Sequence, residues 1–160
     1  MNPLLSGAAA ILAKNDQLLP ATLKGIDDTA YRQVLLPGTS SMAWILGHMT
    51  GSRFLMNKLL GGTEKFPNSE PFHRGATDVD HDALPTVDEI MALWTSMAEV
   101  LPGRLDSAPD EVLNAAGPEG LPSMDGTILG NLTFLALHES YHLGQLGLLR
   151  KASGQPGLAG

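Results

Sequence analysis

One stretch of this chain constrains its fold more than any other, because residues 127–149 carry a single charged residue, Glu139. Apolar side chains lie on every side of a helix built from this stretch. A helix that is apolar all round must be buried. The chain has 160 residues, enough for one domain with one sizeable core. The stretch therefore predicts a helix packed within a bundle.

The first long helix along the chain is expected to cover residues 3–24. Asn2 is a suitable N-cap, and Pro3 suits the first helical position. Pro20 is expected to kink or end this helix, because it cannot donate a hydrogen bond to the carbonyl of Asp16. A short helical piece is expected around residues 27–33.

The second long helix is expected to begin at Ser40 or Ser41 and to end at Gly61. At 100° per residue, one side of this helix is mostly apolar but includes a histidine. That side comprises Ser41, Trp44, Ile45, His48, Ser52, Leu55 and Leu59.

The third helix opens with a capping box formed by Thr86 and Glu89. Pro102 is expected to bend it or to stop it early. The fourth helix is expected to begin at Ser123 or Asp125 and to end near residue 152. Its inward stripe comprises Thr127, Asn131, Phe134, Leu135, His138, His142, Gln145 and Leu149.

Two connections, residues 63–85 and 109–122, show no regular spacing of apolar residues. No segment shows the alternation of a strand. The pattern predicts an all-α four-helix bundle, with long irregular connections between helices two and three and between helices three and four. Residues 1–154 form the single domain, and residues 155–160 are expected to be a disordered tail.

Composition excludes several classes of protein. The absence of cysteine rules out disulfides and thiolate metal ligands. The net charge of -7, with basic residues scattered along the chain, argues against nucleic acid as a partner. No secretory signal and no segment long enough to span a membrane is visible, so we expect a cytoplasmic protein.

The chemistry is concentrated in His138 and His142, which lie four residues apart in the fourth helix. This spacing stacks two imidazoles on one side of a helix, one turn apart, as two ligands of one metal require. The string HESYH also matches the H-E-x-x-H pattern of zinc sites. Both histidines lie on an apolar stripe, where burying an imidazole without a polar partner costs free energy. A bound metal would offset that free-energy cost.

A third ligand must come from elsewhere in the chain. No His, Asp or Glu follows His142, which argues against zinc peptidases, whose third protein ligand follows the motif. His48 lies at the centre of the inward side of the second helix, and two helices of a bundle can direct such residues to one point. We expect residues 63–85 to lie near the open side of this site and to be more mobile than the helices. His73 and His81, within that segment, are expected to be solvated.

The residues around the three histidines have more than one interpretation. Glu139 either acts as a general base, or supports the ligands, or is solvated, because it lies about 100° around the helix from His138. Gln145 either orients a ligand or bonds a neighbouring helix, and we favour the second. Further pocket or supporting candidates are Trp44, Ser52, Asn131, Phe134 and Tyr141.

The strings WILGHM at residues 44–49 and HESYHLGQL at residues 138–146 resemble the DinB/YfiT-like superfamily of four-helix bundles. The resemblance extends over nearly the whole chain. It implies an up-down-down-up bundle with a three-histidine metal site, often with zinc or nickel. It also implies frequent homodimers and, in some relatives, S-transferase or isomerase activity with a low-molecular-weight thiol.

Two classes of function remain open at this point. One is a metal-dependent transferase or hydrolase acting on a small molecule, because an ion with open positions lowers the pKa of a bound water or thiol. The other is a non-catalytic metal-binding or ligand-binding stress-response protein. A homodimer is also expected through the back of the fourth helix, where several small or apolar residues lie. These are Leu129, Ala136, Ser140, Leu143, Gly144 and Gly147.

Overall fold

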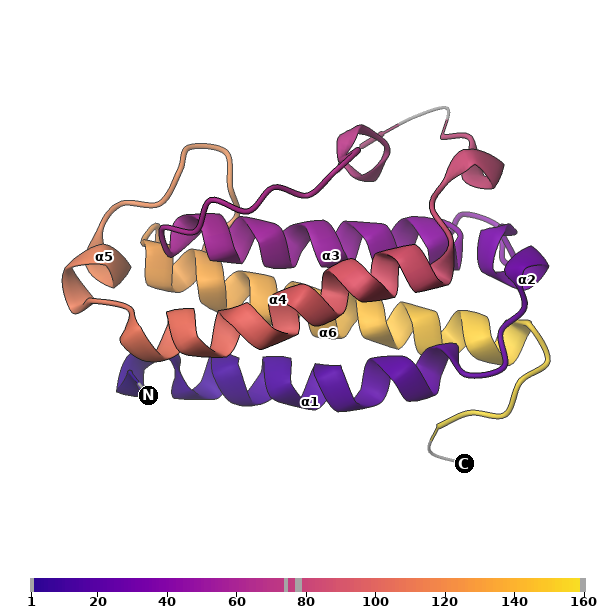
Figure 1. The fold of residues 1–160 in the computed structure, drawn as a ribbon, viewed down its shortest axis with the longest axis horizontal. Helices are drawn as coiled ribbons and strands as arrows, with labels where there is room; N and C mark the ends of the chain where they lie inside the picture. The colour runs from indigo at the N-terminus through magenta and orange to yellow at the C-terminus, as the bar shows by residue number, and fades with distance from the viewer. Residues whose placement is uncertain (1, 74, 77–78, 159–160) are drawn as a thin grey trace.

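Four long helices pack side by side in the computed structural model, which describes residues 2–73, 75–76 and 79–158 (Figure 1). They are α1 (Ser6–Leu23), α3 (Met42–Leu59), α4 (Val87–Ser107) and α6 (Ile128–Ala152). Helices α1 and α6 run in one direction, and α3 and α4 run in the other. Each of α1 and α3 contacts both α4 and α6. The predicted all-α bundle and its up-down-down-up order are confirmed.

Short helical pieces complete the chain at the ends of the bundle and in its connections. The short α-helices α2 (Asp28–Arg32) and α5 (Asp110–Asn114) lie at opposite ends of the bundle (Figure 1). The 3-10 helices are η1 (Pro3–Leu5), η2 (Glu70–Phe72) and η3 (His81–Ala83). Across the described ranges, pairing of the β type is limited to an isolated bridge between Ala116 and Thr127.

Side-chain caps fix where the helices begin. Asn2 accepts a hydrogen bond from the amide of Leu4, and Ser41 accepts one from the amide of Trp44. The predicted capping box of Thr86 and Glu89 is present at α4. Helix α6 begins a few residues later than predicted, because Thr127 is its cap and accepts a hydrogen bond from Gly130. These caps satisfy amides that have no partner within their own helix.

Neither proline ends its helix. Helix α1 continues through Pro20 to Leu23, and α4 continues through Pro102 to Ser107. Packing offsets the hydrogen bond that each proline removes, because the residues flanking both prolines are buried in the core. These flanking residues are Leu19, Leu23, Leu101 and Leu105.

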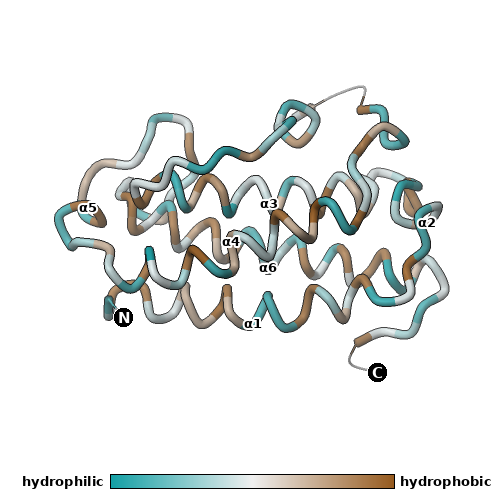
Figure 2. The backbone as a smooth tube through the Cα atoms, viewed as in Figure 1, coloured by the Kyte–Doolittle hydropathy of each residue, from teal (hydrophilic) through white to brown (hydrophobic). Residues whose placement is uncertain are grey.

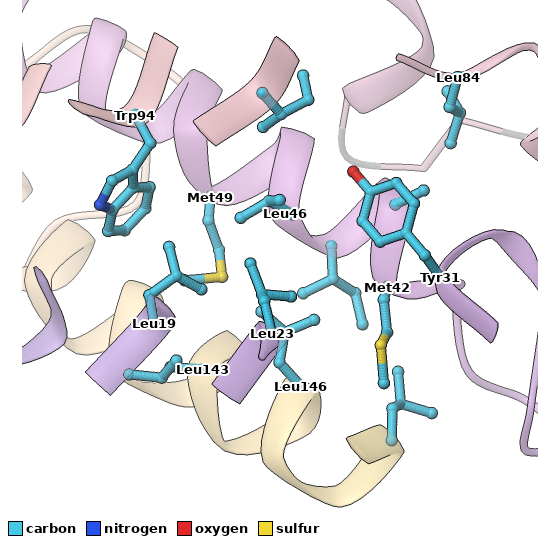
Figure 3. Packing of buried hydrophobic residues seen from close by; sticks show 14 of the residues in the cluster. Leu19, Leu23, Tyr31, Met42, Leu46, Met49, Leu84, Trp94, Leu143 and Leu146 are labelled. Carbon is cyan, nitrogen blue, oxygen red and sulfur yellow. The ribbon is translucent and has the colours of Figure 1, made fainter. Parts of the chain in front are cut away.

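A layer of polar residues divides the apolar core into two clusters. Along each helix, hydrophobic and hydrophilic positions alternate (Figure 2). The cluster nearer α2 brings together residues of all four long helices, among them Leu19, Met49, Trp94 and Leu146 (Figure 3). The other cluster surrounds Leu113 and Leu132. The interruption between the two clusters matters for the site, because it contains charged residues.

Helix α1 covers much of the back of α6. Ala136 and Leu143 are buried within the chain, and Ser140 contacts the side chain of Asn15. Part of the predicted dimer surface is therefore occupied by α1. The outer side of α6 instead exposes Leu137 and Leu148.

The segment after α6 is anchored to the bundle. Gln155 donates a hydrogen bond to the carbonyl of Gly25, and Arg150 donates one to the carbonyl of Pro156. Within the expected tail, Gln155 and Pro156 therefore have partners on the bundle, and residues 159–160 lie outside the described residues. Among the described helices, none is both long enough and apolar enough to cross a bilayer.

Candidate metal centre

Three imidazoles converge where α3 faces α6. The Nε2 atom of His138 lies 3.2 Å from Nε2 of His48 and 3.0 Å from Nε2 of His142. A tetrahedral ion bound at about 2.0–2.1 Å would hold its nitrogen ligands about 3.3 Å apart. The three predicted ligands are thus brought together by the fold at nearly the spacing that one ion requires. The three imidazoles could together hold a metal ion. Among the described residues, this candidate ligand group consists of histidines alone.

The hydrogen bonds of the outer ring nitrogens explain why these rings face one another. Nδ1 of His48 lies 2.7 Å from the carbonyl oxygen of Phe72, and Nδ1 of His142 lies 2.6 Å from Oε1 of Gln145. Because a carbonyl oxygen can only accept, both Nδ1 atoms carry the proton, and both neutral rings present an Nε2 lone pair. His138 has one proton at most to offer at its Nε2 atom. A shared cation satisfies all three nitrogens at once.

Burial keeps two of the ligands neutral. Desolvation lowers the pKa of His48, against a smaller opposing effect of the Phe72 carbonyl. Desolvation also lowers the pKa of His142, against the opposing hydrogen bond to Gln145. Neutral imidazole is the form that coordinates a metal, so both shifts favour metal binding near neutral pH.

Each histidine ring has an aromatic neighbour. Trp44 stacks on His48 with ring centroids 4.7 Å apart, and Phe134 stacks on His138 at 5.9 Å. Tyr141 meets His142 edge-on at 5.2 Å and remains 62% exposed. These three predicted pocket residues therefore do border the site and surround it with aromatic rings.

Glu139 faces away from the histidines, into the polar layer of the core. Its side chain is fully buried, and both oxygens accept hydrogen bonds from Arg53 at 2.8 Å. Asn15 donates a further hydrogen bond to the same carboxylate. Burial raises the pKa of the Glu139 carboxyl, and the Arg53 guanidinium opposes that shift. The expectation that Glu139 could be solvated is wrong. Its carboxylate oxygens bind Arg53 and Asn15 and do not face the three histidines.

Arg53 joins all four long helices through this layer. Its guanidinium also binds Asp16 of α1 at 2.6 Å and lies 3.5 Å from the centroid of the Trp94 ring on α4. Trp94 in turn donates a hydrogen bond to Asp16. The burial of Arg53 could not be predicted from the helical spacing of apolar residues, because arginine is not apolar. Its partners also lie far from it along the chain.

Gln145 orients His142 and also donates a hydrogen bond to the hydroxyl of Tyr141. The interpretation that it bonds a neighbouring helix is therefore wrong, and its alternative role as an orienting group agrees with the structure. Ser52 donates a hydrogen bond to the backbone carbonyl of His48 in its own helix.

Asn131 and His81 have structural partners away from the three histidines. Asn131 donates to the carbonyls of Leu121 and Pro122 and so anchors the connection before α6. His73 is exposed as expected, whereas His81 is half-buried and contacts the Ser41 hydroxyl through Nδ1 at 2.8 Å. The prediction that His81 is solvated is wrong, because it holds its connection against the start of α3.

A cavity of about 270 Å³ lies beside Trp44, between α3 and the connection to α4. The Trp44 indole contacts both this cavity and the His48 ring. None of His48, His138 and His142 lines this cavity, and Trp44 is the residue that the cavity shares with the site. The residues that line the cavity are Ser40, Trp44, Gly75, Ala76, Val79 and His81.

The fold and the three histidines together define a helical bundle protein with a candidate metal centre between two of its helices. Residues 11–146 match the family model of the DinB superfamily, and the chain belongs to that superfamily. No curated protein matches the chain.

Proposed function

We propose that this protein binds one divalent metal ion through His48, His138 and His142 and transfers a thiol to a small electrophilic molecule. The observation that carries the proposal is the convergence of three imidazole Nε2 atoms, with separations of 3.0 and 3.2 Å from the central one. Zinc and nickel are the proposed ions, because both accept imidazole ligands and the chain has no cysteine.

When bound, such an ion lowers the pKa of a coordinated thiol or water to near neutrality. The residues of the chain hold the rings in place: the Phe72 carbonyl orients His48, and Gln145 orients His142. The cavity beside Trp44 is the proposed location of the organic part of the substrate.

The position of Glu139 favours thiol transfer over hydrolysis. Hydrolysis by an H-E-x-x-H site uses the glutamate as a general base toward water. Here both carboxylate oxygens are bound by Arg53 in the core. A thiolate needs no base once its proton is lost to solvent: it forms a sulfur–carbon bond, and the leaving group departs with its electron pair. The arrangement is therefore better suited to a nucleophile that is already ionised.

Metal analysis of the purified protein tests the binding step. We expect about one zinc or nickel ion per chain in the wild type and a loss of tight binding in His48→Ala and in His142→Ala. Gln17→Ala is the control, because Gln17 is exposed on α1 and outside the group. Stoichiometric metal in a variant lacking both His48 and His142 would contradict the site.

A thiol-transfer screen tests the reaction. Several low-molecular-weight thiols are combined with electrophiles that carry a leaving group, with and without chelator. The proposal expects turnover that depends on metal and is lost in His48→Ala. Tight metal binding with no turnover for any pair would support the alternative, a non-catalytic metal-binding protein.

A further inference from the structure

The connection between α3 and α4 packs two phenyl rings against two glycines of α3. Gly47 and Gly51 are four residues apart on this helix, and a phenyl ring lies over each of them. A Cβ atom added at Gly47 would lie 2.1 Å from the ring of Phe72, and one added at Gly51 would lie 3.3 Å from the ring of Phe66. Phe72 can therefore occupy its buried position only because residue 47 has no side chain.

Hydrogen bonds also join the same segment to α3. The Trp44 indole donates a hydrogen bond to the carbonyl of Pro71 at 2.7 Å. His48 donates one from Nδ1 to the carbonyl of Phe72, also at 2.7 Å. At the other end of the segment, Asn57 donates a hydrogen bond to Glu64.

These contacts make the orientation of a metal ligand dependent on the docking of a loop. The carbonyl that fixes the proton of His48 on Nδ1 belongs to the residue whose ring is seated on Gly47. We propose that residues 66–72 form a metal-coupled strap: docking on Gly47 and Gly51 orients His48 for the metal, and metal binding in turn holds the strap on α3. This inference rests on the metal site proposed above.

The coupling must act in both directions, because binding free energies are reciprocal. An undocked strap removes the acceptor of His48 Nδ1, so the ring can rotate and its proton can move to Nε2. Loss of a group that orients a metal-bound histidine typically weakens metal affinity about 10–100-fold. By the same factor, a bound metal shifts the strap toward its docked state.

Glycine substitutions give a graded test. Gly47→Ala places a methyl group within the Phe72 ring and should weaken zinc affinity about 10–100-fold. Gly51→Ala meets only the edge of Phe66, so its effect should be smaller. Gly144→Ala is the matched control, because nothing lies within 4 Å of a Cβ atom at that helical position. Leu105→Ala controls for global stability, since Leu105 is buried in the cluster that surrounds Leu113.

Two measurements on the full chain test whether zinc affinity and the docking of the strap change together. Competitive zinc titration gives the affinity of each variant, and amide hydrogen exchange of residues 66–73 with and without zinc gives the docking of the strap. In the wild type we expect zinc to slow this exchange. In Gly47→Ala we expect faster exchange and weaker zinc binding together. Leu105→Ala should lose stability but keep its zinc affinity.

A second substitution distinguishes a loss of His48 orientation from a general loss of stability. In Gly47→Ala/Phe72→Leu the smaller side chain leaves room for the methyl group, so slow exchange and zinc affinity should recover together. If Gly47→Ala does not fold, Phe72→Ala provides the same test, because it removes the ring that seats the carbonyl. Wild-type affinity in a variant with an undocked strap would overturn this inference alone. A wild type that binds no zinc would overturn the metal site itself.

Discussion

Arg53 and Glu139 form a bidentate ion pair in the centre of the bundle, in which each of two nitrogen–oxygen contacts is 2.8 Å long. Arg53 lies on α3, as does His48, and Glu139 directly follows His138 on α6. The pair therefore joins the same two helices that supply the three histidines of the candidate metal centre. It gives the glutamate of the H-E-x-x-H string a structural role in this chain.

Replacing Arg53 with methionine should destabilise the protein by about 3–5 kcal/mol, because Glu139 would remain buried without its partner. Chemical denaturation measures the change. Lys58→Met is the control on the same helix, and since Lys58 is exposed its effect should stay within about 0.5 kcal/mol. The double variant Arg53→Met/Glu139→Leu should recover much of the loss, because no fully buried carboxylate is left unpaired, while Asp16 is partly exposed and keeps the hydrogen bond from Trp94. A Glu139→Gln variant of unchanged stability that has lost only its activity would instead indicate a general base.

Metal affinity should decrease as the pH falls through the pKa values of His48 and His142, which burial places below 6.5, the ordinary value for histidine. Burial lowers the pKa of His48 and His142, so both stay neutral in the folded protein while the unfolded chain takes up protons. Stability from these groups is thus complete above pH 6.5 and is lost as the pH falls toward their folded pKa. Below that pH, proton competition should weaken zinc about tenfold per pH unit for each ligand that must be deprotonated. Zinc titrations between pH 5 and 7.5 measure this, and a flat profile would argue against imidazole ligation.

Gln145→Leu should weaken metal binding about 10–100-fold, because Nδ1 of His142 would lose its acceptor. Competitive zinc titration measures the loss. The control Gln17→Leu makes the same chemical change at an exposed position of α1. Equal affinities in the two variants would show that Gln145 does not orient the ligand.

The candidate metal centre was predictable because its parts follow helical geometry. His138 and His142 share one side of a helix through their spacing, and His48 lies at the centre of an apolar stripe. Side chains placed by a helix carry this periodic signal. The four helices could be predicted for the same reason, and the caps located most of their starts.

The groups that support the metal ligands could not be predicted from periodicity. Phe72 contributes a backbone carbonyl, and every residue type has one. Arg53 and Glu139 meet only through tertiary packing, 86 positions apart in sequence. Because α6 is apolar around most of its circumference, its pattern does not show which side meets α1 and which side is exposed. For this reason the dimer surface expected from the sequence includes positions that α1 covers.

The outer side of α6 is the surface that we now expect to form a homodimer. Leu137 and Leu148 are 53% and 55% exposed, and Tyr141 and Gly144 lie on the exposed part of the same helix between them. The one charged residue from 127 to 149 is Glu139, which is buried. Two negatively charged chains can therefore approach along this side without placing like charges opposite each other. A two-fold axis would bring the same apolar side chains of both copies together.

Leu137→Glu/Leu148→Glu should convert a homodimer into a monomer, because four carboxylates would enter a self-complementary apolar interface. Light scattering at micromolar concentration measures the mass, and circular dichroism checks that the fold is kept. Val112→Glu is the control, since Val112 is also an exposed apolar residue but lies on α5. The wild type and this control should both be dimers. A monomeric wild type would contradict the prediction, and so would a dimer that survives both α6 substitutions, because association would then use another surface.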